Sequence, residues 1–476
     1  MGWTLLVGVA LAAAPLPKTL AEAEARGLQP VEAPPSIAGP PTVIRGGTVM
    51  TATGQTYAPG FVVLRAGKIE AVGAGEPPKV DGAVVVDAKG RVVTPGLIDT
   101  HSHNGVYASP GGNGADDGNE ATAPTTPGVW AEHSIWPQDP GFLRALAGGV
   151  TTMQVLPGSA NLVGGRGVIV HVVPTLGSRA MRLSGAPETL KMACGENPKR
   201  VYGGGKGSAP STRMGNLRGQ REAFLEAQAY AWEWAEYERK QSEYAKKLEE
   251  PPAKAKKGAP PPAPAEPPKP PKRDLDKETL VGVLQGRILP EVHCYRADDM
   301  LSFLQLADEF GFEVRSFHHA LEAYKIRDVL AAKHVAVSTW ADWWGFKEEA
   351  YDGIPENLAM VSAAGGRAVV HSDSPIGIQR LNQEAGKGMW SGRRAGIAVS
   401  EDEALRWITV NPAWALGIDG QVGTLEVGKR ADVVVWSADP FSVYTRADQV
   451  WVDGVSRWDA ANPTVWSDFE IGQELK

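Results

Sequence analysis

Cysteine is scarce in this chain of 476 residues, which contains only Cys194 and Cys294. Two cysteines exclude a disulfide framework and cannot form a thiolate zinc site, although a single disulfide between them stays open. Histidine is scarce as well, with nine residues in the whole chain. Histidines that lie close together in such a sequence are therefore informative about function.

The chain also lacks the basic character of a nucleic-acid-binding protein. Its formal net charge is −7, and no basic run is interleaved with aromatic residues as a nucleic-acid groove requires. With 43% hydrophobic residues at this length, the sequence is able to form a large globular core. We therefore expect a small-molecule substrate and no nucleic-acid partner. A homodimer is the usual expectation for a soluble oligomer, but no sequence feature specifies one.

The N-terminal region has an apolar run that is too short to span a bilayer as a helix. It extends from Trp3 to Ala14 and resembles the hydrophobic part of a secretory signal, with small-x-small cleavage sites at residues 12–14 and 21–23. No basic residue precedes it. We expect residues 1–41 to be a signal peptide with a Pro/Ala-rich linker, and the protein to be exported, either periplasmic or secreted. The alternative is an uncleaved tail on a cytoplasmic protein.

Both ends of the remaining chain have the pattern of short strands. Over residues 42–94, runs of β-branched residues alternate with Gly and Pro turn signals, and a similar pattern returns over 422–460. We expect the two regions to pair into one small β-sandwich domain that closes the chain around its middle.

The middle of the chain, residues 95–421, alternates strand-like and helix-like segments, which is typical of parallel βα units. The region is long enough for eight units, so we predict an α/β fold, a (β/α)8 TIM barrel with catalytic residues at the strand ends. An insert over 219–275 interrupts the alternation. Its first part predicts an amphipathic helix that packs on the barrel, and residues 251–273 predict a Pro/Lys-rich loop.

The most informative motif is the segment 95–103, a strand-like run that ends with His101 and His103. Because side chains alternate across a strand, histidines at i and i+2 point to the same side. Two neutral imidazoles that converge in this way are able to hold one metal ion. Alone, such a pair is more often part of a polar turn.

Further residues with metal-ligand chemistry follow four other predicted strands. They are His293, the adjacent His318 and His319, Asp373, and Lys191. Each has a structural explanation on its own, as a loop residue or a turn. Together with the histidine pair, and in this order along the chain, they predict one metal-binding site at the mouth of the barrel.

The order of these residues resembles that of the amidohydrolase superfamily, and the resemblance covers residues 42–460. Segments 95–103 and 423–432 are similar to the two most specific signatures of that superfamily, and segments 411–413 and 416–417 are similar to its usual final-helix motif. Within the superfamily the chain most resembles the imidazolonepropionase-like and secreted dipeptidase-like branch. The segments that carry this finer resemblance are 156–167, 191–198 and 319–325.

The resemblance implies a distorted barrel that holds one or two divalent metal ions, usually zinc. It implies that His101 and His103 bind the more buried ion together with Asp373. It also implies that His293 and His319 bind the second ion.

A bridging ligand between the two ions is implied at the fourth strand. Lys191 is the first choice and Glu196 the alternative. Because a free ammonium cannot be a ligand, Lys191 serves only if it is carbamylated. His319 is preferred over its neighbour His318, because strand alternation places the two on opposite sides, and His371 is interpreted as a core or supporting residue.

This metal chemistry predicts hydrolysis. Zinc lowers the pKa of a bound water toward ~7, which supplies hydroxide at neutral pH. We expect the hydroxide to attack a metal-polarised carbonyl, and Asp373 to act as general base and then as general acid toward the leaving nitrogen. Candidate substrate-binding residues are Asn161, Arg166 and Tyr202. Arg166 suits a substrate carboxylate, and the alternative for it is a structural salt bridge.

We therefore predict an enzyme, an amidohydrolase that cleaves a C–N bond of a cyclic amide or a dipeptide. Deamination or ester hydrolysis within the same superfamily is the alternative reaction. A non-catalytic barrel that binds a partner through its helical insert is the rival from another class. The complete set of candidate ligands favours the enzyme, because a relative without activity is expected to have lost at least one of them.

Overall fold

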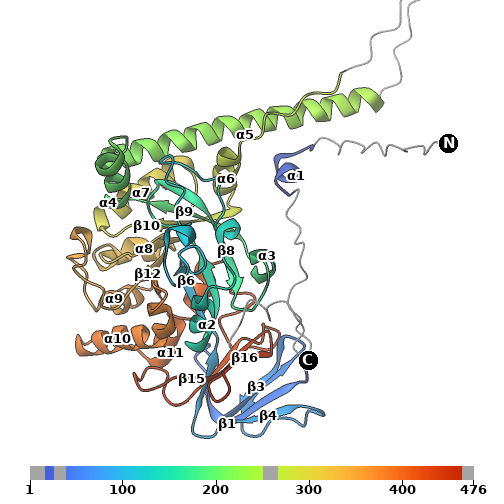
Figure 1. The fold of residues 1–476 in the computed structure, drawn as a ribbon, viewed down its shortest axis with the longest axis vertical. Helices are drawn as coiled ribbons and strands as arrows, with labels where there is room; N and C mark the ends of the chain where they lie inside the picture. The colour runs from blue at the N-terminus through green and yellow to red at the C-terminus, as the bar shows by residue number, and fades with distance from the viewer. Residues whose placement is uncertain (1–16, 26–38, 250–265, 464–476) are drawn as a thin grey trace, which may run out of the picture.

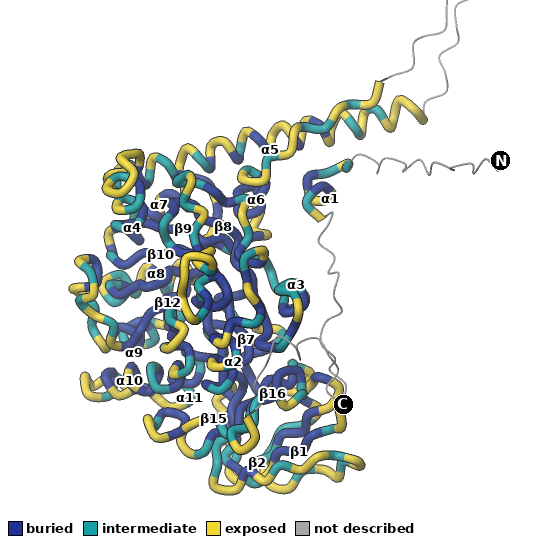
Figure 2. Tube along the Cα trace, viewed as in Figure 1, coloured by how far each residue is buried: buried dark blue, intermediate teal, exposed yellow. Residues whose placement is uncertain are grey.

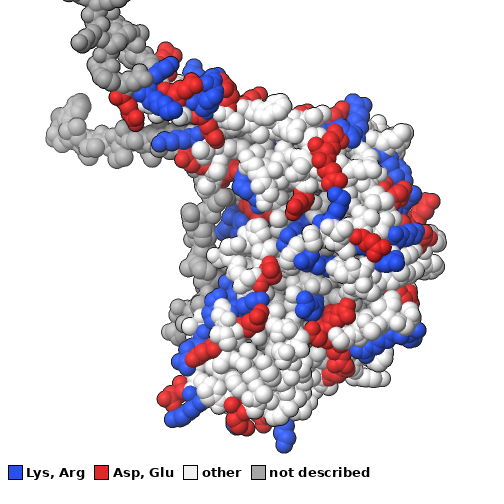
Figure 3. All heavy atoms as spheres, turned by 180° about the vertical axis from the view of Figure 1, so that it is seen from behind, with Lys and Arg blue, Asp and Glu red and all other residues white. Residues whose placement is uncertain are grey.

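The computed structural model describes residues 17–25, 39–249 and 266–463, so the apolar run of the predicted signal lies outside the described residues. Figure 1 shows a barrel-like body with a small sheet at one end and the long helix α5 across the other. In the described part of the chain, no helix combines the length and the apolar character that a membrane crossing requires. On the face seen in Figure 3, basic and acidic side chains are interspersed.

The small sheet joins strands from both ends of the chain in the order β16-β15-β14-β5-β1-β2-β3, with β4 paired to β1. The central contact is antiparallel and aligns Val433 with Pro95 and Trp436 with Val92. Its buried side chains form a cluster of their own, which includes Ile44 and Trp451. The strands are β1 (Thr42–Met50), β2 (Thr56–Arg65), β3 (Lys68–Ala74), β4 (Val84–Asp87), β5 (Val92–Pro95), β14 (Val433–Trp436), β15 (Ala447–Val452) and β16 (Val455–Asp459).

The second sheet has eight strands in sequence order, from β6 to β13. Its two outer strands approach each other where the backbone N–H of Asp373 donates to the carbonyl of His101 at 2.9 Å, so the sheet is nearly closed. Strands β6, β7 and β8 are buried along their whole length, as Figure 2 shows for the middle of the body. The strands are β6 (Leu97–Ser102), β7 (Val150–Val155), β8 (Val163–His171), β9 (Glu188–Ala193), β10 (Ile288–His293), β11 (Ser316–His318), β12 (Ala336–Thr339) and β13 (Arg367–Val370).

One barrel strand differs from the predicted all-parallel arrangement. Strand β8 runs antiparallel to both of its neighbours, β7 and β9. The connection from β7 to β8 is only residues 156–162, which is too short for the crossover that parallel strands require. This loop is rich in Pro, Gly, Ser and Asn and acts as a turn. The alternation of strand and helix is therefore interrupted at this point of the barrel.

Helices cover the outside of the barrel, and several begin at a side chain that caps them. Asp139 accepts from the N–H of Gly141 at α2, Asp274 from that of Lys277 at α6, and Ser400 caps α11 in the same way. The described helices are α1 (Leu20–Ala25), α2 (Pro140–Ala147), α3 (Ser178–Met181), α4 (Glu196–Lys199), α5 (Arg213–Glu249), α6 (Leu275–Leu284), α7 (Ala297–Phe310), α8 (Arg327–Ala332), α9 (Asn357–Ala363), α10 (Leu381–Arg394), α11 (Glu401–Arg406) and α12 (Val410–Ala415).

Helix α5 begins at Arg213, six residues earlier than the predicted insert. A stripe of its side chains, including Phe224, Tyr230 and Trp234, is buried against the body. The distal part extends beyond the barrel in Figure 1, and Trp232 on the other face is 73% exposed. Most of the predicted Pro/Lys-rich loop lies outside the described residues.

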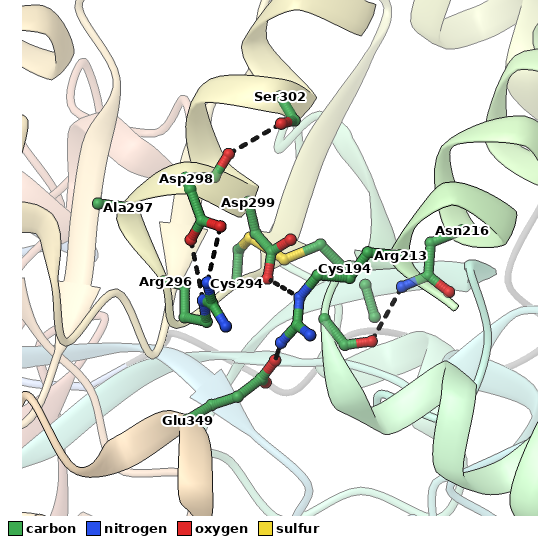
Figure 4. Close-up of a disulfide and its surroundings, with 12 residues drawn as sticks. Cys194, Arg213, Asn216, Cys294, Arg296, Ala297, Asp298, Asp299, Ser302 and Glu349 are labelled. Carbon is green, nitrogen blue, oxygen red and sulfur yellow. Dashed lines mark hydrogen bonds and ion pairs between the residues drawn. A yellow bond between two sulfur atoms is a disulfide. The ribbon is translucent and has the colours of Figure 1, made fainter. Parts of the chain in front are cut away.

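A disulfide joins Cys194 and Cys294, whose Cα atoms are 5.3 Å apart. The two residues directly follow β9 and β10, so the bond ties neighbouring strand ends together at the mouth of the barrel (Figure 4). Arg213, the first residue of α5, lies beside it and bonds to Asp299 at 2.8 Å and to Glu349. The single disulfide that the two cysteines left open is thus formed, and the ion pairs of Arg213 anchor the start of the long helix beside it.

Candidate metal centre

Two histidines at the end of β6 face the carboxylate of Asp373. Nε2 of His103 lies 3.1 Å from Oδ1 of Asp373, and Nε2 of His101 lies 3.6 Å from the same oxygen. Their ring centroids are 5.0 Å apart. The i and i+2 spacing on a strand thus directs both imidazoles to one point. The three ligand atoms lie within 4.8 Å of one another, as a shared metal ion requires.

Asp373 and His319 both adopt backbone conformations that are rare for their residue types. Asp373 has φ 48° and His319 has φ 59°, in the left-handed region. His319 directly follows β11, and Asp373 comes shortly after the end of β13. Nδ1 of His319 lies 3.9 Å from Oδ2 of Asp373. Strained backbone of this kind gathers at functional sites, where the surroundings hold it in place. Here it directs both side chains into the cluster.

His293 supplies an independent sign that the cluster fits a cation. It ends β10, is 3% exposed, and neither of its ring nitrogens has a hydrogen-bond partner. Its ring lies 4.7 Å from that of His319, whose Nδ1 also lacks a hydrogen bond. Buried polar atoms without partners are costly, so these nitrogens match the donors that a metal ion would use.

Lys191 lies within the same cluster, whereas Glu196 does not contact it. Nζ of Lys191 is 3.1 Å from Nε2 of His101, and the side chain is fully buried in β9. Burial lowers the pKa of Lys191 to about 7, so the neutral amine that carbon dioxide captures is populated at neutral pH. Glu196 lies on α4 and faces Nζ of Lys347 at 3.5 Å.

Burial favours the neutral form of His101, His293 and His319, which is the form that binds metals. It lowers the pKa of His101, His293 and His319 well below the ordinary value, and the nearby charge of Lys191 acts in the same direction. Burial alone would raise the pKa of Asp373. The hydrogen bond and charge of His103 outweigh that effect, so the pKa is lowered and Asp373 is a carboxylate.

Three other residues contact the cluster: His371, which was predicted to be a core or supporting residue, His318, which was set aside in favour of His319, and Glu291, to which the sequence assigned no role. His318 lies between His101 and the buried Glu291, with contacts of 2.8 and 2.7 Å. Nε2 of His371 accepts from the backbone N–H of His319 at 3.2 Å, and burial lowers the pKa of His371 to about 4. Glu291 had a usable signal, because it lies two residues before His293 and thus on the same side of β10.

The three predicted substrate-binding residues have structural partners within the protein. Arg166 forms an ion pair with Glu188 and donates to Thr279 at 2.8 Å, so the alternative of a structural salt bridge describes it in this structure. Asn161 and Tyr202 bond to each other at 2.6 Å. The amide of Asn161 also donates to the carbonyl of Glu120 and the hydroxyl of Thr126, and the single hydroxyl proton of Tyr202 is shared between Asn161 and the carbonyl of Ala123. The sequence did not predict these hydrogen-bond partners.

Aromatic side chains pack on one histidine of the cluster. Trp340 stacks on His319 with ring centroids 4.7 Å apart, and Trp343 stacks on Trp340 at the same distance. A cavity of about 290 Å³ is lined by Trp343 and Trp344. A second cavity of about 660 Å³ is lined partly by Val106 and Pro157, which lie close along the chain to His103 and to its carbonyl partner Leu156.

A second buried group of histidine and carboxylates lies between the barrel and the small sheet. His171, at the end of β8, has Nδ1 3.0 Å from Asp453 and Nε2 3.6 Å from Asp432. Arg430 bonds to Asp453 at 2.7 Å. No candidate from the sequence fell on this group, which is called the His171 cluster below.

Comparison with known proteins shows the family of this chain. An amidohydrolase from Thermotoga maritima MSB8 has a solved structure that superimposes with a TM-score of 0.75 at 34% identity, covering 88% of this chain and all of that one. The chain belongs to the amidohydrolase superfamily. Residues 349–457 also match the profile of the Amidohydrolase family. The resemblance deduced from the motifs is thereby confirmed at the level of the superfamily.

Two curated amidohydrolase relatives are similar over parts of their length. Amidohydrolase tasK of Hapsidospora irregularis is 33% identical over 387 residues, which are 78% of this chain and 37% of tasK. N-substituted formamide deformylase of Arthrobacter pascens is 38% identical over 129 residues, which are 25% of this chain and 23% of that enzyme. The chain thus spans little more than a third of the larger matched relative.

Proposed function

We propose that this amidohydrolase is a metal-dependent hydrolase that cleaves a C–N bond in a small amide, either a cyclic amide or a dipeptide. The observation that carries the proposal is the convergence of His101, His103 and Asp373 from opposite edges of the barrel sheet onto one point. The similarity to tasK and to a formamide deformylase supports a reaction at a C–N bond.

The donor set fits one or two zinc ions. His101, His103 and Asp373 would hold one ion, and His293 with His319 the other, with Lys191 as a carbamate between them. When bound, such an ion polarises a carbonyl and lowers the pKa of water. Two anionic groups among neutral imidazoles offset much of the charge of two dications.

The residues of the chain have separate tasks in this proposal. Asp373 is a carboxylate held by His103, so it is able to accept a proton from the attacking water and return it to the leaving nitrogen. Trp340, stacked on His319 and buried, keeps one side of the site apolar and limits the access of water.

Metal content tests the proposal before any substrate is known. We expect elemental mass spectrometry of the purified chain, reconstituted with zinc and bicarbonate, to find close to two equivalents of zinc. Both His101→Ala and Asp373→Ala should reduce that number. A panel of dipeptides and cyclic amides then tests the reaction, with nitrogen-containing product as the readout. An unmodified chain that binds no metal would contradict the proposal and favour a non-catalytic scaffold.

We further infer that the protein is exported. The disulfide between Cys194 and Cys294 supports this, because such bonds persist in oxidising compartments and are rare in the cytosol. Cell fractionation followed by N-terminal sequencing tests it. We expect a processed protein outside the cytoplasm, and an unprocessed cytoplasmic protein with two free thiols would contradict the inference.

A further inference from the structure

A line of hydrogen bonds runs through the barrel interior and ends at His101. Nδ1 of His101 lies 2.8 Å from Nδ1 of His318, and Nε2 of His318 lies 2.7 Å from Oε2 of Glu291. The three side chains come from β6, β11 and β10, and each is fully buried. Because buried polar atoms need partners, every donor in this line has to meet an acceptor.

The direction of proton donation along this line follows from the chemistry of imidazole. A neutral imidazole has one N–H and one acceptor nitrogen, so the Nδ1–Nδ1 contact holds a single proton. For Nε2 of His101 to offer its lone pair beside Asp373, that proton has to be on Nδ1 of His101. His318 then accepts on Nδ1, carries its own proton on Nε2 and donates it to Glu291. The opposite direction puts a proton on Nε2 of His101, where it excludes a metal ion.

His103 reaches the same tautomer in a simpler way. Its Nδ1 lies 2.8 Å from the backbone carbonyl of Leu156, which only accepts hydrogen bonds. His103 therefore keeps a proton on Nδ1, and Nε2, which faces Asp373, is the nitrogen left for a metal ion. Both histidines of the motif thus have Nδ1 directed at a fixed partner and Nε2 directed at the same carboxylate. Only His101 depends on side chains for this arrangement.

We propose that Glu291 and His318 are positioning residues that hold His101 in its metal-binding tautomer. Glu291 is the terminal acceptor and His318 passes its effect to His101. The proposal rests on the metal-dependent function proposed above. Loss of either residue should weaken metal binding by about 10–100-fold, the usual cost of removing a partner that orients a ligand.

Zinc affinity of the full chain, measured by competition with a chromogenic chelator, tests this with matched variants. His318→Leu and Glu291→Met remove the hydrogen bonds and keep similar volumes, and we expect both to bind zinc more weakly. His318→Gln and Glu291→Gln still offer a carbonyl acceptor, and we expect both to stay close to the unmodified chain. His133→Leu changes an exposed histidine and serves as the control. Circular dichroism verifies that each variant is folded.

Each outcome decides one way. Weak binding by the Leu and Met variants with retention by the two Gln variants supports the proposal. A folded His318→Leu that binds zinc like the unmodified chain overturns it, as does a Gln variant as weak as its apolar counterpart. If His318→Leu does not fold, the pair at Glu291 decides by the same criterion. An unmodified chain that binds no zinc removes the proposed function as well, whereas unchanged affinity in the variants removes only the positioning role.

Discussion

Among the residues that the structure describes, two groups of histidine and carboxylate have similar donors and differ in their charge. Both have three ligand atoms within 4.8 Å of one another. The barrel cluster combines His101 and His103 with Asp373, and the His171 cluster combines His171 with Asp432 and Asp453.

The His171 cluster is balanced by cations of the protein itself. Arg430 bonds to Asp453 at 2.7 Å, and the charge of Arg457 also acts on that carboxylate. The charges of the two carboxylates and the two guanidinium groups cancel. A metal dication bound here would therefore add positive charge that no group of the cluster compensates. Because His171 ends barrel strand β8 while Asp432 and Asp453 adjoin strands of the small sheet, we interpret this cluster as a structural link between the two sheets.

The barrel cluster has no comparable balance among the residues described. Burial lowers the pKa of His101 well below its ordinary value, Asp373 is a carboxylate, and the pKa of Lys191 is lowered to about 7. The ring nitrogens of His293 lack partners. Nε2 of His171 and Oδ2 of Asp432 also lack hydrogen-bond partners, so the two clusters differ in their charge balance and not in the presence of unpartnered atoms. Ligand types and distances alone therefore do not identify a metal site, and the difference in charge makes the two clusters separable by experiment.

The largest expected difference concerns catalysis. Asp373→Asn removes the proton acceptor and should lower kcat by about 10²–10⁴-fold, the range for a general acid–base group. Asp453→Asn is the matched change in the His171 cluster and should leave kcat unchanged. Steady-state kinetics with an amide from the substrate panel checks both. Equal losses in the two variants would contradict the assignment of separate roles.

A smaller effect, on stability, is expected from the His171 cluster. His171→Ala removes one partner of a buried ionic group and should cost about 3 kcal/mol in free energy of unfolding. Zinc content should not change. Urea unfolding followed by tryptophan fluorescence measures the first quantity and elemental analysis the second, with exposed His133→Ala as the reference. A loss of zinc without a loss of stability would make the His171 cluster a metal site after all.

The pH dependence of stability should also reflect the His171 cluster. The carboxylate of Asp453 faces His171, Arg430, Arg457 and Asp432. Burial alone would raise the pKa of Asp453. The hydrogen bonds and charges of His171 and Arg430 outweigh burial and lower that pKa well below its ordinary value. A carboxyl with a lowered folded-state pKa stabilises the protein above its unfolded-state pKa of about 3.9, and the contribution is lost as pH falls further. Each unit of difference between the folded-state and unfolded-state pKa corresponds to about 1.4 kcal/mol in the free energy of unfolding.

Urea midpoints measured from pH 6 to pH 3 check this. We expect the unmodified chain to lose stability more steeply below pH 4 than Asp453→Asn does. Burial raises the pKa of Asp432, which acts in the opposite direction and reduces the slope. Parallel curves for the two proteins would show that Asp453 does not have the lowered pKa.

Much of the barrel site could be predicted from the sequence, because its information is local. A strand with His101 and His103 two residues apart fixes their common direction, and strand ends of one sheet meet at one edge. The superfamily followed from the same motifs. Sequence alone did not predict the reversed strand β8, because its pairing depends on neighbours distant in the chain and only the short loop 156–162 hints at it.

Partners that come from distant parts of the chain account for the other differences. Arg166 was a candidate for a substrate carboxylate, but the fold brings Glu188 and Thr279 to its guanidinium. The His171 cluster joins residues more than 250 positions apart, so no spacing rule could find it. Short-range patterns thus predicted which side chains share an edge, while long-range packing decided which of them already have partners.

The smallest expected effect separates the two candidates for the bridging ligand. Glu196 faces Lys347 at 3.5 Å on a partly exposed surface, so Glu196→Gln should cost less than about 1 kcal/mol in stability and leave zinc content unchanged. Lys191→Met, in contrast, replaces a buried amine beside His101 with a side chain of similar length and should reduce zinc below two equivalents. Elemental analysis of both variants after incubation with bicarbonate is the measurement. If Glu196→Gln loses zinc and Lys191→Met keeps it, the bridging role belongs to the carboxylate, and the loop around α4 has to move toward the cluster when metal binds.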